Sequence, residues 1–67
     1  MAITLKAARV NKGLRQDQAA KRLGITADTL RSYETFKSFP DVPMIKKMEE
    51  LYGMSYNDLI FLPTDNG

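Results

Sequence analysis

The chain has 67 residues, no cysteine, no histidine and a net charge of +2. These absences exclude disulfides, thiolate nucleophiles, imidazole bases and nearly every zinc-ligand set. The remaining carboxylates, lysines and hydroxyl groups form no convergent arrangement, so we expect no enzyme, metal, cofactor or small-molecule site. A domain this small buries only about 60% of its unfolded surface, which favours helices with local contacts. No apolar run is long enough for a membrane span or a signal peptide, so we expect a soluble cytoplasmic protein.

Basic residues are concentrated in the first part of the chain. Residues 1–37 carry eight basic and three acidic side chains, a net charge of +5. Residues 38–67 carry two basic and five acidic side chains, a net charge of −3. This asymmetry indicates an anionic partner for the basic part, although chance clustering on a solvated surface explains the counts equally well.

Helical signals follow one another along the chain, whereas no segment alternates β-branched with polar residues as a strand would. The predicted helices span residues 4–12, 16–23, 27–35, 42–52 and 56–61. Thr4, Thr26 and Asp41 are the expected N-caps of the first, third and fourth helices. Glycines follow the first, second and fourth helices, where a left-handed residue is common. These signals predict an all-α domain over residues 1–62 and a flexible tail over residues 63–67.

Local signals also bound the short fifth helix and the segment before the fourth. Ser55 and Asp58 have the spacing of a capping box at the start of the fifth helix, and Pro63 closes that helix. Pro40 interrupts the pattern after the third helix, because a proline disfavours helix at the residue before it.

The segment 16–36 has the pattern of two helices that meet at a steep angle through a short turn. Ala20 must be small because the next helix crosses close to it, and Gly24 must adopt a left-handed backbone conformation. Ile25 would fill the corner from the apolar side, and Thr26 would cap the following helix. The pattern therefore favours a helix-turn-helix unit over a generic helical hairpin in a small bundle.

With these residues the chain resembles the phage repressor/Cro (xenobiotic-response-element, XRE) family of helix-turn-helix proteins, over about residues 5–61 and without a gap. The matching residues are Leu5-Lys6-Ala7-Ala8-Arg9, Lys12-Gly13-Leu14, Gln16, Ala20, Leu23-Gly24-Ile25-Thr26, Leu30, Tyr33-Glu34, Lys37, Pro40, Ile45, Gly53, Ser55 and Leu59. The resemblance implies a compact five-helix, lambda-repressor-like domain whose third helix lies in the DNA major groove. It also implies a phage or prophage origin and an ion pair between Arg9 and Glu34.

The front of the third helix would read DNA bases. The expected base-reading residues are Thr26, Ala27, Asp28, Arg31 and Ser32. Four of them share one helical face, on which Arg31 can bond a guanine edge and Ala27 can touch a thymine methyl. Ala27 and Ser32 replace longer amide side chains of the family. Asp28 either accepts from cytosine, pairs with Arg31, or marks a helix that binds DNA weakly.

Phosphate contacts would supply most of the affinity. The candidates are Arg15, Gln16, Lys21 and Lys37, whereas the direction of Arg22 is not fixed by the pattern. Gln16 resembles the family glutamine whose amide and neighbouring backbone N–H hold a phosphate, and a helix N-terminus favours an anion there. The alternative for the basic residues is that they serve solubility alone.

The chain has more apolar residues near its end than a monomer needs. Phe36 stands where the family often has glycine, and a second phenylalanine, Phe39, comes three residues later. We expect at least one of these rings in the core, and otherwise an exposed partner-binding patch. Together with Tyr56, Ile60, Phe61 and Leu62, they predict a homodimer through the fourth and fifth helices. Such a dimer would place two recognition helices about 34 Å apart.

The sequence thus predicts a sequence-specific DNA-binding transcriptional regulator of Cro or repressor type, which binds a double-stranded operator. The alternative is a protein-interaction module on the same scaffold, an antitoxin or accessory subunit with weak or no DNA binding. Asp28 and the aromatic loop favour this second interpretation.

Overall fold

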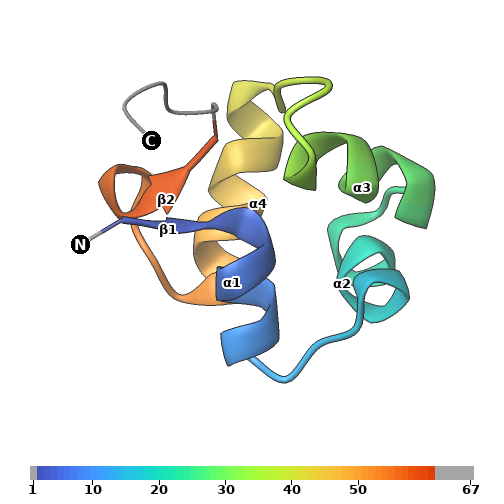
Figure 1. Ribbon diagram of the computed structural model, residues 1–67, viewed down its shortest axis with the longest axis horizontal. Coiled ribbons are helices and arrows are strands. Elements are labelled where there is room, and N and C mark those ends of the chain that lie inside the picture. The colour runs from blue at the N-terminus through green and yellow to red at the C-terminus, as the bar shows by residue number, and fades with distance from the viewer. Residues whose placement is uncertain (1, 62–67) are drawn as a thin grey trace.

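The computed structural model of the protein describes residues 2–61, which form four α-helices and one two-stranded sheet (Figure 1). The elements in chain order are β1 (Ile3–Thr4), α1 (Leu5–Asn11), α2 (Gln16–Leu23), α3 (Ala27–Glu34), α4 (Val42–Tyr52), the 3₁₀ turn η1 (Tyr56–Asp58) and β2 (Leu59–Ile60). Among these residues, no helix is both long and apolar enough to cross a membrane.

The predicted bounds of α2 and α4 agree with the structure. Those of α1 differ by one residue at each end, and those of α3 by one residue at its C-terminal end. Each predicted N-cap accepts a hydrogen bond from a backbone N–H three residues later. The Thr4 hydroxyl accepts from Ala7 at 3.1 Å, and the Asp41 carboxylate accepts from Met44 at 3.0 Å. These side chains satisfy N–H groups that have no partner within the helix, which explains why the helices begin where they do.

The prediction of a fifth helix over residues 56–61 is wrong. Ser55 does bond Asp58 (3.0 Å), but only the single turn η1 follows before the chain becomes extended. β2 then pairs in parallel with β1, Ile3 opposite Leu59. Leu59 and Phe61 are buried while Ile60 between them is half-buried, so the segment follows the two-residue period of a strand. Leu62, Pro63 and the predicted tail over residues 63–67 lie outside the described residues.

The hydrophobic core lies between α1, α4 and the helix pair α2 and α3, and β2 closes one side of it (Figure 1). Its buried members are Leu5, Ala8, Ala19, Ala20, Leu23, Leu30, Ile45, Met48, Tyr52, Leu59 and Phe61. Each large side chain of this set contributes about 1.5–3 kcal/mol of burial free energy. The core therefore fixes α2 and α3 against α1 and α4.

We expected at least one of the two phenylalanines in the loop between α3 and α4 to lie in the core. Neither does. Phe39 is exposed, and Phe36 is half-buried outside the core cluster, while Pro40 is the fully buried residue of this loop. Phe36 instead has the left-handed backbone conformation, with φ +65°. The backbone N–H of Phe36 donates to Tyr33 and that of Lys37 to Ser32, which together make the hydrogen-bond pattern of a Schellman motif.

Candidate nucleic-acid interface

α2 and α3 meet through a turn of three residues, 24–26. Gly24 has the left-handed conformation (φ +75°) that ends α2, and the Ile25 backbone N–H donates to the Ala20 carbonyl at 3.0 Å. Ala20 is fully buried, so a larger side chain there would meet neighbouring core residues. The Thr26 hydroxyl then accepts from the Thr29 backbone N–H and caps α3. The turn therefore holds the two helices in a fixed relation.

One face of α3 is exposed and the opposite face is buried. Ala27, Asp28 and Arg31 are exposed together, whereas Leu30 is completely buried. Ser32 is half-buried, and the Thr26 hydroxyl is engaged with Thr29. Of the five residues expected to read bases, four are thus exposed and one is half-buried, and the hydroxyl of the exposed Thr26 is already used to cap α3.

Asp28 lies in the first turn of α3 and pairs with Arg31, at 3.6 Å between Oδ1 and Nη2. The two side chains are 91% and 67% exposed, so solvent and salt screen the attraction and its contribution is at most about 1 kcal/mol. The Asp28 carboxylate also interacts favourably with the N-terminal end of the helix dipole. Of the three alternatives for Asp28, the structure contains the pair with Arg31. This pair is weak enough for Arg31 to exchange it for another partner.

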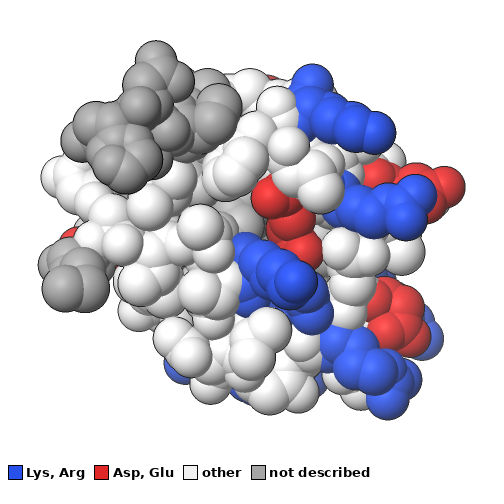
Figure 2. Space-filling view, viewed as in Figure 1, with Lys and Arg blue, Asp and Glu red and all other residues white. Residues whose placement is uncertain are grey.

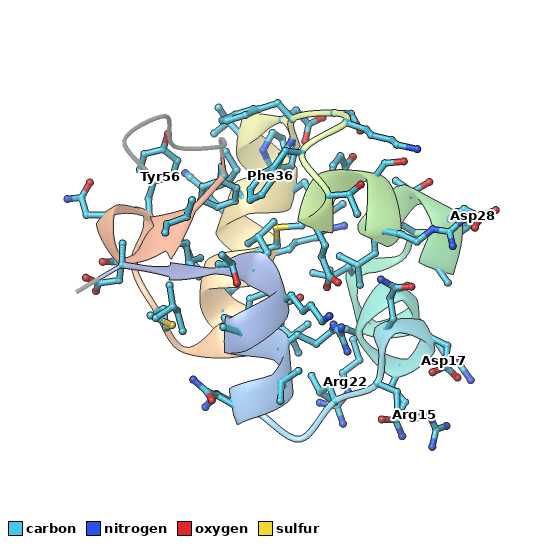
Figure 3. All side chains as sticks on the ribbon, viewed as in Figure 1. Arg15, Asp17, Arg22, Asp28, Phe36 and Tyr56 are labelled. Carbon is cyan, nitrogen blue, oxygen red and sulfur yellow. The ribbon has the colours of Figure 1, made fainter. Side chains whose placement is uncertain are left out.

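The N-terminus of α2 carries two of the predicted phosphate contacts. Arg15 is exposed and donates through Nε to Asp17 at 3.2 Å (Figure 3). This hydrogen bond is the main reason that the pKa of the Asp17 carboxyl lies below its ordinary value. Gln16 is half-buried, and its Nε2 donates to the Glu34 carboxylate at 3.1 Å.

Arg9 and Glu34 form a buried, two-pronged ion pair between α1 and α3. Arg9 Nε lies 2.7 Å from Glu34 Oε2, and Nη2 lies 3.2 Å from Oε1. Arg9 Nη1 donates in addition to the Leu14 carbonyl at 3.0 Å. Because the carboxylate and the guanidinium are both well bonded, the cost of burying the two charges is offset. The pair ties α1 and the loop after it to the end of α3.

These observations describe two helices in fixed relation, with one open face on the second. A helix-turn-helix family model matches residues 5–59, from the first residue of α1 to the first residue of β2. The chain belongs to the XRE-type helix-turn-helix family. This is a family of DNA-binding regulatory domains and not of enzymes. Comparison with curated proteins and with solved structures gave no match.

Basic side chains of this helix-turn-helix domain gather over α2 and α3, with acidic side chains between them, as Figure 2 shows on its right-hand side. Lys21 is exposed on α2, and Lys37 is exposed in the loop after α3. Arg22, in contrast, lines an open depression of about 510 Å³ together with Lys47, Glu50 and Leu51 of α4. The direction of Arg22 is therefore toward α4.

The sequence interpretation missed that Gln16 and Glu34 are bonded to each other. The two residues are eighteen positions apart, and no periodicity or cap links them. The family resemblance implied the pair of Arg9 with Glu34, which the structure contains, but not that α2 begins beside the end of α3. In the XRE-type domain the contact of Gln16 with Glu34 joins the predicted phosphate residue to the buried ion pair.

Proposed function

We propose that this domain is a sequence-specific DNA-binding transcriptional regulator that places α3 in the major groove of a double-stranded operator. The observation that carries the proposal is the open face of α3, formed by Ala27, Asp28 and Arg31 on a helix whose other face is fixed by Leu30. An α-helix fits the major groove, where each base pair presents a distinct pattern of donors and acceptors. Family membership supports the same conclusion.

Arg31 is the main base reader in this proposal. Its side chain is two-thirds exposed, and its guanidinium can exchange the weak contact with Asp28 for two hydrogen bonds to guanine. Such a bidentate contact contributes about 1–3 kcal/mol of discrimination against the wrong base. Ala27 offers a methyl group for contact with thymine, and Asp28, once released by Arg31, can accept from cytosine.

Arg15, Gln16, Lys21 and Lys37 supply phosphate contacts along α2 and after α3 in this proposal. Their contribution depends on counterion release, so it falls as the salt concentration rises. Phosphate contacts fix the register of α3 on the duplex without carrying sequence information.

We further propose that two copies bind an operator of two-fold symmetry. Phe39, Val42 and Tyr56 are exposed large hydrophobic residues, and the rings of Phe39 and Tyr56 both lie against Phe61, with centroids 5.8 and 5.1 Å apart. Tyr56 and Asp28 lie at opposite ends of the molecule in Figure 3. A partner that covers Tyr56 therefore leaves Asp28 and the start of α3 open. A bound dimer of Cro or repressor type would act by occupying the operator.

Selection of bound duplexes from a random pool tests this function directly. We expect enrichment of a symmetric site whose half-sites lie about one helical turn apart. Arg31→Ala should then relax the preference at particular base positions, whereas Gln16→Ala should weaken binding to all duplexes alike. Equal, sequence-independent effects of both variants would show that α3 is not the reader.

A protein-interaction module on the same scaffold is the second candidate. The exposed carboxylates of Asp17 and Asp28 favour it, because they place negative charge beside the proposed phosphate contacts. Titration with random-sequence duplex at two salt concentrations separates the two functions. A DNA-binding domain loses affinity steeply with salt, while a complete lack of binding at low salt would favour the interaction module.

A further inference from the structure

Gln16, Glu34 and Arg9 form a continuous chain of hydrogen bonds from the surface of α2 to the buried side of α1. Glu34 Oε1 accepts from both Arg9 Nη2 (3.2 Å) and Gln16 Nε2 (3.1 Å), and Oε2 accepts from Arg9 Nε (2.7 Å). The Glu34 side chain is 3% exposed, whereas Gln16 is half-buried at the first residue of α2. This series of hydrogen bonds thus begins at a partly exposed side chain on the surface of α2.

The chemistry of these groups fixes the orientation of the Gln16 amide. A carboxylate only accepts hydrogen bonds, so the amide must turn its nitrogen, and not its oxygen, toward Glu34. One N–H of the amide is then used by Glu34, and the described residues provide no partner for the other. A phosphate oxygen also only accepts, so this second N–H is the group of the side chain that can bind it.

We propose that Glu34 is a positioning residue for DNA binding, which holds the Gln16 amide so that its free N–H donates to a backbone phosphate. The inference rests on the proposed function, because it requires a duplex at the N-terminus of α2. A glutamine held in one rotamer before binding loses less conformational entropy when the phosphate arrives.

Arg9 makes this use of Glu34 possible. An uncompensated carboxylate one amide group away from a phosphate would repel it, and burial would leave that repulsion poorly screened. The two-pronged pairing with Arg9 neutralises the carboxylate while Oε1 stays available to Gln16. The ion pair therefore has a role in DNA binding in addition to holding α1 on α3.

Two double variants separate positioning from structure. Arg9→Met with Glu34→Leu, the acceptor-free variant, removes both charges and leaves no acceptor for Gln16. Arg9→Met with Glu34→Gln, the acceptor-retaining variant, removes the same charges and keeps one acceptor. Replacement of a buried ion pair by groups of similar volume is often tolerated, so both variants are expected to fold. The property that separates them is the hydrogen-bond partner offered to Gln16.

The measurement is the affinity for operator duplexes in which one phosphate at a time is replaced by an uncharged methylphosphonate. The phosphate bound by Gln16 is the position where the replacement weakens the wild type by about tenfold and weakens Gln16→Ala much less, because only the backbone N–H contact remains in that variant. We expect the acceptor-free variant to lose this sensitivity and the acceptor-retaining variant to keep most of it. Both should keep the sensitivity at phosphates contacted by Lys21 and Lys37.

Each other outcome has a distinct meaning. If the acceptor-free variant remains as sensitive as the wild type at the phosphate bound by Gln16, Glu34 does not position the amide and the inference is wrong. If operator binding is sensitive to phosphates but none depends on Gln16, the inference is wrong while the DNA-binding function stands. If the wild type binds no duplex, the proposed function itself is wrong.

A measurement on the wild-type protein covers the case in which the acceptor-free variant does not fold. The side-chain amide of Gln16 should be rigid in the free protein by NMR relaxation, and duplex addition should shift its resonances. A methylphosphonate at the phosphate bound by Gln16 should abolish that shift. A mobile amide in the free protein, with an order parameter below about 0.6, would overturn the inference without any variant.

Discussion

Phe36 has a backbone conformation that side chains with a Cβ rarely adopt, and it ends α3 in the place where glycine is usual. The left-handed conformation costs a residue with a Cβ about 1–2 kcal/mol relative to glycine. We therefore expect Phe36→Gly to be more stable than Phe36→Ala by about 1 kcal/mol, since both variants lose the ring and only one keeps the strain. Urea denaturation measures the difference. Equal stability would mean that the turn relaxes when the ring is removed.

Tyr52 is buried in the core, and within the part of the chain described here its hydroxyl has no hydrogen-bond partner. Burial, reinforced by the negative charge of Glu34, raises the pKa of Tyr52 from 10.0 to about 12. In the unfolded chain the phenol ionises near pH 10, while in the folded chain it stays neutral. Stability must therefore fall as the pH rises from 10 toward 12, by about 1.4 kcal/mol per pH unit.

Tyr52→Phe isolates this effect, because it removes the ionisable group and the unpaired hydroxyl together. Below pH 9 we expect the variant to be as stable as the wild type or more stable. Between pH 10 and 12 the wild type should lose free energy of unfolding relative to the variant. Chemical denaturation at several pH values measures both, and a parallel decline of the two proteins would contradict the assignment.

At the residue level, the sequence predicts what local chemistry determines. The N-caps Thr4 and Asp41 and the left-handed Gly24 are recognisable because each acts within three or four positions of itself. The bond between Gln16 and Glu34 is not recognisable in this way, because it depends on how α2 and α3 cross. The exposure of Phe39 likewise depends on where the loop runs, which no local pattern states.

At the level of elements, the first turn of α2 contains an acid, Asp17, that pairs with Arg15, one of the proposed phosphate contacts. Asp17 is exposed and accepts a hydrogen bond from Arg15, which holds the pKa of the Asp17 carboxyl below its ordinary value. Asp17→Asn should free Arg15 and remove repulsion toward phosphate, so duplexes of any sequence should bind several-fold more tightly at low salt and less so at high salt. Fluorescence anisotropy with random duplex measures this change.

The control for Asp17→Asn is Glu50→Gln on α4, which changes the net charge equally beside the Arg22 depression. If the two variants tighten binding by the same factor, net charge and not the α2 terminus is responsible. Asp17→Asn should also lose a small, solvent-screened helix-dipole contribution, seen as a slightly lower melting temperature.

The helices were predictable as elements and the strands were not. Each helix carries an apolar stripe and end signals within its own sequence, so α2 and α4 have the predicted bounds. β1 and β2 contain two residues each and pair across 56 positions, so neither shows a period of its own. The alternation of Leu59, Ile60 and Phe61 becomes readable as a strand only once β1 is known to lie beside it.

At the level of the whole molecule, the exposed Tyr56 lies at the opposite end from Asp28 of α3 in Figure 3, so we expect assembly and DNA reading to be separable. Val42 is 64% exposed at the first position of α4. Val42→Glu should raise the concentration needed for dimerisation and for operator binding, with little effect on stability, because a carboxylate is favourable at a helix N-terminus. Sedimentation and operator titration measure the two concentrations.

The corresponding control is Arg31→Ala, which should weaken operator binding without changing sedimentation. If the Val42→Glu protein dimerises and binds the operator like the wild type, the contact between the two copies lies elsewhere on the surface. An effect on operator binding without an effect on sedimentation would mean that the two copies meet only on DNA.

The parallel pairing of β1 with β2 has a practical consequence for work with this protein. Both ends of the described chain are brought to the same side of the molecule, across the core from α2 and α3 (Figure 1). A fluorophore, an affinity tag or a fused reporter attached at either end of the described residues would start from the side remote from α3. Either end of the described residues is thus a suitable side from which to immobilise the domain on a sensor while the exposed face of α3 stays open to solution.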